Sequence, residues 1–296
     1  MQATGRDSNN DVSRRMSGAA RLLIIFIAIL CTGYTAAASY MYAFQRDFVF
    51  KPDGVLASPS SKGLPNVTQE VVSLEDGTSI TVWSALPTLK EAPTVLYFHG
   101  QSGNVSGRAS RFQQIVESGF GLYAPSYRGF AGSEGMPSEA AFIEDGLAYF
   151  DQLEAAGAEV ILHGESLGTG VAAAVAEQRP SARMLILEAP YTAAEDMAAQ
   201  RYPWLPVSLL MRDPFLTRDR IAAVEAPTLI VHGSADTVIP VENGRKLFKL
   251  ATEPKRLEIV EGVDHGSLWK NGLWSEVKRF LADTGDQSWS DTAPKN

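Results

Sequence analysis

The most informative segment of the chain covers residues 160–171 and reads Val160-Ile161-Leu162-His163-Gly164-Glu165-Ser166-Leu167-Gly168-Thr169-Gly170-Val171. It starts as a short apolar run, passes through the pattern G-x-S-x-G, and continues as a helical pattern of small residues. In a sharp strand-to-helix turn the two glycines relieve crowding against the neighbouring backbone, and the serine hydroxyl stands clear of both elements. N–H groups at the start of the helix then point toward developing negative charge. The segment therefore predicts that Ser166 is a nucleophile, rather than a solvated serine in a Gly-rich turn.

Short β-rich runs lie on both sides of this segment, and helical patterns lie between them. The runs predict eight strands, at residues 67–74, 79–83, 94–98, 120–124, 159–163, 184–187, 228–232 and 256–260. The helical patterns cover residues 110–118, 138–155, 168–178, 241–250 and 272–281. Strands without clean hydrophobic alternation are typical of a sheet covered on both faces. Strand alternating with helix predicts a single α/β domain with a mainly parallel sheet over residues 67–282.

Composition excludes several classes of protein. The 296 residues carry a formal charge of −8, with 45% hydrophobic and 20% charged side chains. These values exclude a disordered tail, a collagen-like repeat and a basic nucleic-acid binder. The single cysteine excludes an internal disulfide framework. P-loop glycines and Cys/His metal spacings are absent from the sequence, so we expect neither a cofactor nor a metal ion.

The N-terminal part of the chain predicts a membrane segment. Residues 22–44 carry no charge, and as a helix they would extend ~34 Å, which is enough for the ~30 Å hydrocarbon core. The basic segment 1–21 predicts a cytoplasmic N-terminus and a translocated body, periplasmic in a bacterium. A signal peptide cleaved near Ala38, which would give a secreted protein, stays open as the alternative. Residues 45–66, of which 47–62 are rich in Pro, Gly and Ser, are predicted to be a spacer or an irregular entry segment rather than a domain, and residues 283–296 a C-terminal tail.

A serine hydroxyl needs a base to become a good nucleophile, and the chain contains four histidines. His99, His163 and His232 each end a predicted strand directly before a glycine, which indicates a fixed structural position. His265 lies instead in a loop between the last predicted strand and the last predicted helix. Because a loop histidine at that edge reaches the serine and can still move, we expect His265 to be the base.

The third member of the site should orient His265 and stabilise its charged form. Asp236 follows the predicted strand 228–232 and precedes His265 by 29 residues. Glu188 ends the preceding strand and stays open as the rival, since an acid there also reaches the loop. We favour Asp236, and separate deletion of each acid would decide between them.

The alternation of strand and helix breaks at about residues 190–226, where an apolar stretch is interrupted by prolines. Two interpretations stay open: a helix packed over the sheet, or a small cap that shapes an apolar substrate pocket over the catalytic face. Asp213 lies in this stretch and is expected to pair locally with Arg212 or Arg218.

The chain order Ser166, Asp236, His265 is the order of the α/β-hydrolase fold, which the sequence resembles over about residues 67–281. Residues 127–133 are similar to the segment that follows the fourth strand of that fold. With the proline-rich cap, these motifs resemble the membrane-anchored serine hydrolases of the α/β-hydrolase-domain type. The resemblance implies an eight-stranded, mainly parallel sheet flanked by helices.

The same resemblance implies an oxyanion hole. Residues 99–104 look like the oxyanion loop of the family, whose pattern assigns the backbone N–H groups of Gln101 and Leu167 to the oxyanion. Tyr127 and Arg128 are expected to be structural, linking a strand to its turn.

The expected activity is hydrolysis of carboxylic esters or thioesters through an acyl-enzyme. An anchor at residues 22–44 beside an apolar cap favours lipid-type acyl substrates, which already reside in a membrane. The expected partners are such a small-molecule substrate and the bilayer, not a nucleic acid. Two alternatives stay open: a peptidase of the same fold, and a membrane-tethered binding or scaffold protein that has lost the chemistry.

Overall fold

The computed structural model describes residues 17–285 of the chain. It divides into two compact units, one ending at Phe44 and the other beginning at Gln45, and each is described by itself. The predicted basic segment 1–21 and tail 283–296 therefore lie mostly outside the described residues.

The described residues of the first unit form one helix, α1 (Gly18–Ala43). The Ser17 side chain caps its N-terminus by accepting a hydrogen bond from the Ala20 N–H at 3.2 Å. None of its side chains is buried. With 26 residues and a mean hydropathy of 2.1, the helix is long and apolar enough to cross a membrane. A signal sequence near the N-terminus would meet the same criteria.

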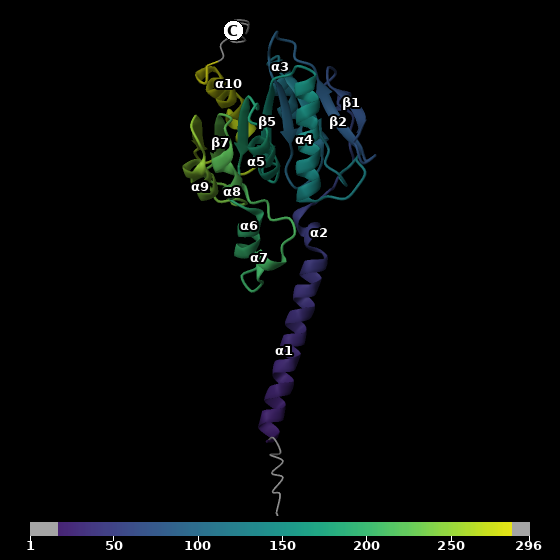
Figure 1. Cartoon of the computed structure of the whole chain (residues 1–296), viewed down its shortest axis with the longest axis vertical. Helices are drawn as coiled ribbons and strands as arrows, with labels where there is room; N and C mark the ends of the chain where they lie inside the picture. The colour runs from purple at the N-terminus through teal and green to yellow at the C-terminus, as the bar shows by residue number, and fades with distance from the viewer. Residues whose placement is uncertain (1–16, 286–296) are drawn as a thin grey trace, which may run out of the picture. The chain divides into compact units, whose positions relative to one another are not determined.

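The second unit is built on one eight-stranded sheet with the order β1-β2-β4-β3-β5-β6-β7-β8 (Figure 1). The strands are β1 (Thr68–Ser73), β2 (Ser79–Ala85), β3 (Thr94–Phe98), β4 (Gly121–Pro125), β5 (Val160–Glu165), β6 (Met184–Glu188), β7 (Thr228–Gly233) and β8 (Lys255–Val260). Strand β2 runs antiparallel to both β1 and β4, and the other pairs are parallel. The predicted fold class, with its eight-stranded and mainly parallel sheet, is confirmed.

Helices cover both faces of the sheet, as the apolar strands require. One face packs against α4 (Glu139–Ala155), α5 (Gly168–Gln178) and α9 (Glu242–Leu250), and the other against α3 (Ala109–Glu117) and α10 (Leu273–Asp283). Each helix–sheet layer has its own hydrophobic core, so the sheet is held rigidly between them. The carboxyl ends of the parallel strands are therefore fixed relative to one another.

Three short helices follow β6 within the predicted cap: α6 (Ala194–Arg201), α7 (Val207–Leu210) and α8 (Thr217–Arg220). Short 3-10 turns complete the element order at Ser60–Lys62, Val105–Arg108, Ile221–Ala223 and Leu268–Asn271. Prolines separate the short helices of the cap, because proline cannot donate a hydrogen bond within a helix: Pro203 and Pro206 lie between α6 and α7, and Pro214 lies between α7 and α8.

Of the two interpretations of residues 45–66, the structure favours an irregular entry segment over a spacer. These residues contain a short helix, α2 (Gln45–Val49), and belong to the second unit. Phe50 is 2% exposed and packs edge-on against Phe142, and Leu64 is equally buried in the other core. The Pro, Gly and Ser content correctly indicated little regular backbone structure, but it says nothing about whether the apolar residues between them pack.

Candidate active site

Ser166 occupies a strained turn between β5 and α5. Its φ of +50° is in the left-handed region, which costs a non-glycine residue about 1–3 kcal/mol. The turn is crowded on both sides: a Cβ on Gly164 would lie 2.5 Å from the Gly168 carbonyl oxygen, and one on Gly168 would lie 2.0 Å from the Phe98 carbonyl oxygen. Only glycine fits either position, so the sequence pattern follows from the packing of α5 against β3.

His265 lies beside this serine. Its Nε2 is 3.1 Å from Ser166 Oγ, and its Nδ1 is 2.6 Å from Asp236 Oδ2. The loop that carries His265 follows β8, and Asp236 follows β7, so parallel neighbouring strands bring both to one sheet edge. The structure thus places the three residues predicted from the sequence in one hydrogen-bonded chain.

Asp236 is held in place by groups other than His265. Its Oδ1 accepts hydrogen bonds from the backbone N–H groups of Val238 and Ile239, both at 2.8 Å. Burial raises the pKa of Asp236, but hydrogen bonds from His232 and His265 and from the backbone outweigh it and keep the pKa well below its usual value. The carboxylate is therefore charged and oriented toward the imidazole.

This charge determines the protonation behaviour of His265. Burial lowers the pKa of the imidazole, but the hydrogen bond and negative charge of Asp236 outweigh it, and the net pKa lies above the usual value. A histidine with such a pKa accepts a proton readily and holds it beside the carboxylate. The arrangement can therefore take a proton from Ser166 and return it to a leaving group.

The other three histidines are fully buried: His99 directly follows β3, His232 is the last residue but one of β7, and His163 lies within β5, which continues two residues beyond the predicted end. His99 Nδ1 lies 2.8 Å from the Gly100 carbonyl oxygen, and His232 Nε2 lies 2.9 Å from the Ile239 carbonyl oxygen. Burial lowers the pKa of His99 to about 3, so it remains neutral.

Glu188, the rival acid, makes its contacts elsewhere. It is 1% exposed, accepts a hydrogen bond from Trp269 Nε1 at 2.8 Å, and pairs with Arg111 at 3.1 Å. Its Oε2 also lies 3.1 Å from His163 Nε2. These contacts hold the Glu188 carboxylate within the core, and the acid that is hydrogen-bonded to His265 Nδ1 is Asp236.

Asp213 has two partners that the sequence did not indicate. It accepts hydrogen bonds from Arg46 Nε at 2.8 Å and from the Glu139 backbone N–H at 2.8 Å. Arg46 lies 167 residues before Asp213 in the chain, and no local sequence pattern indicates such a distant pair.

The predicted oxyanion residues both line the pocket that contains Ser166. Within residues 17–285, the N–H groups of Gln101 and Leu167 donate no hydrogen bond to another part of the chain. Leu167 directly precedes α5, where N–H groups are free to bind an anion. Two unused donors therefore lie near the serine hydroxyl.

Sequence reasoning missed the role of Glu165, which lies between the motif glycine and Ser166. Its Oε2 accepts hydrogen bonds from the Gly100 backbone N–H at 3.2 Å and from Arg108 Nε at 2.9 Å. Burial raises the pKa of this carboxyl, but Arg111 and Arg108 outweigh it and hold the pKa well below its usual range. Glu165 thereby fixes the start of the loop that carries Gln101. In the sequence, the one indication of this role is an acidic residue within the motif Gly164–Gly168.

The pocket at Ser166 has a volume of about 270 Å³. Its apolar wall comes from α2, α6, the residue after α7 and the loop after Asp236; the side chains are Phe48, Val49, Ala194, Met197, Ala198, Met211, Val238 and Ile239. Arg201 is the one charged side chain among the described residues of the lining. The described residues contain no cluster of His, Cys, Asp and Glu suited to a metal ion.

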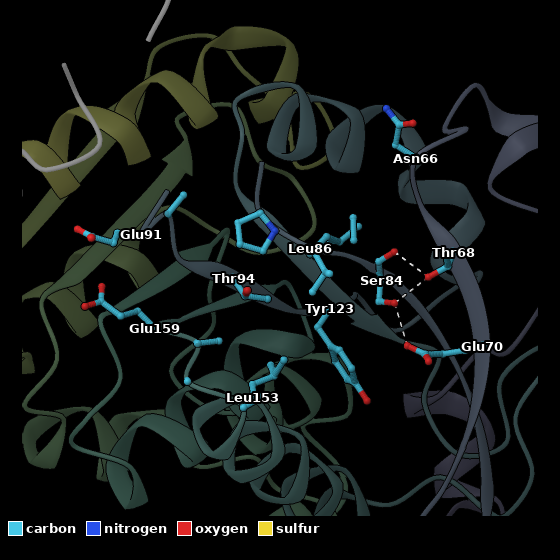
Figure 2. A pocket seen from close by; sticks show the side chains of 17 residues that line it. Asn66, Thr68, Glu70, Ser84, Leu86, Glu91, Thr94, Tyr123, Leu153 and Glu159 are labelled. Carbon is cyan, nitrogen blue, oxygen red and sulfur yellow. Dashed lines mark hydrogen bonds between the residues drawn. The ribbon is translucent and has the colours of Figure 1, made fainter. Parts of the chain in front are cut away.

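A larger hollow of about 990 Å³ lies elsewhere, around the first residues of β3 and the end of α4 (Figure 2). Thr94, which begins β3, and Leu153 of α4 line it, together with Glu70 on the side of β1. It contains neither Ser166 nor His265, and it lies at the amino ends of the parallel strands. Size alone therefore does not identify the active site.

Several known proteins are similar to this chain. Residues 90–212 match the family described as serine aminopeptidase, S33. An uncharacterized protein of Mycobacterium tuberculosis is 32% identical over 266 residues, which cover 87% of this chain and 94% of the relative. Lysophosphatidylserine lipase ABHD12 of Xenopus tropicalis is 29% identical, covering 90% of this chain and 84% of the lipase. An esterase structure from Pyrococcus furiosus shares the fold, with a TM-score of 0.64 and 15% identity over 79% of this chain and 98% of the esterase.

Proposed function

Because the chain belongs to the α/β-hydrolase family, we propose that it is a serine hydrolase that cleaves carboxylic esters or thioesters. The observation that carries the proposal is the hydrogen-bonded chain from Ser166 Oγ through His265 to Asp236, with distances of 3.1 Å and 2.6 Å. Nucleophile, base and orienting acid in this order form the arrangement that activates a serine hydroxyl.

The proposed mechanism has two halves. His265 takes the proton of Ser166 as the hydroxyl oxygen attacks the substrate carbonyl, and the Gln101 and Leu167 N–H groups donate to the oxyanion. The imidazolium, stabilised by Asp236, then gives its proton to the leaving alcohol or thiol. Water cleaves the acyl-enzyme by the same proton transfers, which restores the free serine.

We propose lipid-type acyl esters as the substrates. The largely apolar pocket lining supports this choice, and so does the similarity to a lysophosphatidylserine lipase. The apolar helix α1 adds support, since we propose that it anchors the protein to a membrane with the catalytic domain translocated.

The test is covalent labelling of the full-length protein with a fluorophosphonate probe. We expect labelling of the wild type and none of Ser166→Ala, because the probe reacts with an activated serine. Absence of labelling in intact, folded protein would support the alternative of a binding or scaffold protein and would overturn the proposal.

A peptidase is the second candidate, because the matching family is described as a serine aminopeptidase. An aminopeptidase needs an anionic group for the substrate ammonium, and no acidic side chain appears among the described lining residues of the Ser166 pocket. Hydrolysis of p-nitrophenyl octanoate should therefore exceed hydrolysis of leucine p-nitroanilide. The reverse preference would favour the peptidase.

A further inference from the structure

The segment of residues 45–53, which follows the apolar helix directly in the chain, crosses the region of the candidate site. It contacts the cap at its beginning and the loop carrying Gln101 at its end. Neither the fold nor the proposed chemistry requires a segment ahead of the first strand to do this. We therefore examine whether its contacts have a role in the function of the site.

Gln45 and Arg46 bind the cap through four hydrogen bonds. The Gln45 side chain donates to the Leu210 carbonyl oxygen at 3.1 Å and accepts from the Arg212 N–H at 2.7 Å. Arg46 donates to both carboxylate oxygens of Asp213, at 2.8 Å and 3.3 Å. Because Asp213 is 2% exposed, this bidentate pair is shielded from solvent on the acid side and fixes the geometry strongly.

The far end of the segment binds the predicted oxyanion loop. The Lys51 N–H donates to the Gln101 carbonyl oxygen at 2.8 Å, and Asn104 Nδ2 donates to the Asp53 carbonyl oxygen at 3.2 Å. Between the two ends, Phe50 is anchored in the core against Phe142. The segment is thus held at three points, and its middle cannot move independently of the site.

Phe48 and Val49 lie between these fixed points and line the Ser166 pocket. The cap residues Met197 and Met211 line the same pocket. Phe48 is 39% exposed, so its ring borders solvent on one side and the pocket on the other. An apolar ring at the border of an apolar pocket shields from water whatever chain extends past it.

We propose that Phe48 is a specificity-determining residue of the substrate site, which forms a wall for the acyl chain, and that the contacts of Gln45 and Arg46 hold the cap against this wall. The inference rests on the proposed esterase function and names the part of the chain that selects its substrates. Long acyl chains reach the Phe48 wall and short ones do not, so the segment acts on selectivity.

The experiment compares kcat/KM for p-nitrophenyl octanoate and p-nitrophenyl acetate in the full-length protein in detergent micelles. Phe48→Ala should lower the octanoate-to-acetate ratio about tenfold, the effect of losing a methylene-sized apolar contact or more. Arg46→Met should also lower the ratio, because loss of the hydrogen bonds to Asp213 releases the cap. Asp47→Asn is the matched control, since its exposed side chain lies on the same helix outside the pocket lining, and it should leave the ratio unchanged.

A second measurement separates this inference from the proposed chemistry. Affinity for a dansyl-labelled fatty acid, which needs no turnover, should also fall about tenfold in Phe48→Ala and remain unchanged in Asp47→Asn. An unchanged ratio and unchanged affinity in a Phe48→Ala protein that melts like the wild type would overturn the inference and leave the esterase proposal standing. A wild type without ester turnover or probe labelling, but with the affinity difference, would instead overturn the esterase proposal alone.

Discussion

Asp236 and Glu188 both lie at the ends of strands on the same sheet edge, and they differ in what their carboxylates contact. We predict that Asp236→Asn lowers kcat by about 10³–10⁴-fold, because the amide neither stabilises the imidazolium nor holds the reactive tautomer of His265. Glu188→Gln should affect kcat far less and should lower the melting temperature instead, because it disrupts the buried contacts with Arg111 and Trp269.

Ester turnover and thermal unfolding of the two variants, measured side by side, check this prediction. A larger loss of kcat in Glu188→Gln than in Asp236→Asn, at equal folded fraction, would assign the orienting role to Glu188.

The raised pKa of His265 predicts the pH dependence of activity. The base must be neutral to accept the serine proton, so activity is lost as the pH falls through its pKa. Because Asp236 raises that pKa above its usual value of 6.5, the acid limb of kcat/KM should have its midpoint above 6.5. Asp236→Asn removes the charge and should move the midpoint of its residual activity to lower pH.

The pH profile of an uncharged ester measures both midpoints. An acid limb below the usual histidine range in the wild type, or the same midpoint in both proteins, would contradict the assigned coupling of His265 to Asp236.

Individual residues were predictable where chemistry left few choices. With four histidines and three of them at strand ends, the need of Ser166 for a base pointed to His265. The contacts of Asp213 and Glu165 were not predictable, because their partners Arg46 and Gly100 come from distant parts of the chain. Such pairs depend on tertiary packing, which composition and periodicity do not report.

At the scale of elements, the close approach of α5 to β3 explains why the turn around Ser166 needs glycine. We predict that Gly168→Ala destabilises the protein by about 3 kcal/mol, because the new methyl group would overlap the Phe98 carbonyl oxygen, which belongs to rigid backbone. Gly107→Ala is the matched control: its Cβ would meet nothing within 4 Å, and its effect should be small.

Urea unfolding of both variants gives the free energies of unfolding. Equal stability of Gly168→Ala and Gly107→Ala would show that the turn has more room than the structure indicates.

The strands and long helices were predictable to within a few residues, because apolar runs between turn residues report burial directly. The predicted strand 94–98 is β3 without any shift, and the helix 168–178 is α5. The segment 45–66 was not predictable in this way, since its packing depends on a few apolar residues, including Phe50 and Leu64, within an irregular backbone. Pattern reasoning finds periodic elements and misses irregular segments that pack.

At the scale of the whole chain, the even average composition conceals two different parts. No charge occurs between Arg21 and Arg46, whereas the remainder of the chain carries the net negative charge. The structure divides into its two units between Phe44 and Gln45, where the uncharged stretch ends. Sequence alone could locate the boundary because hydropathy and charge both change there, but the choice between anchor and signal peptide depends on processing, which leaves no trace in the fold.

We predict that α1 is retained and anchors the protein, so that the intact chain stays in the membrane pellet after extraction with alkaline carbonate. The uncharged stretch continues past Ala38 to Phe44, which suits a spanning helix better than a short signal sequence. Ile29→Arg, near the middle of α1, should weaken insertion by about 3 kcal/mol and move protein into the soluble fraction. An exposed change in the catalytic unit, Asp47→Asn, should leave the distribution as in the wild type. Recovery of the wild type as soluble protein whose N-terminus lies near Ser39 would instead establish cleavage, and the proposal of a membrane-bound hydrolase would then give way to a secreted one.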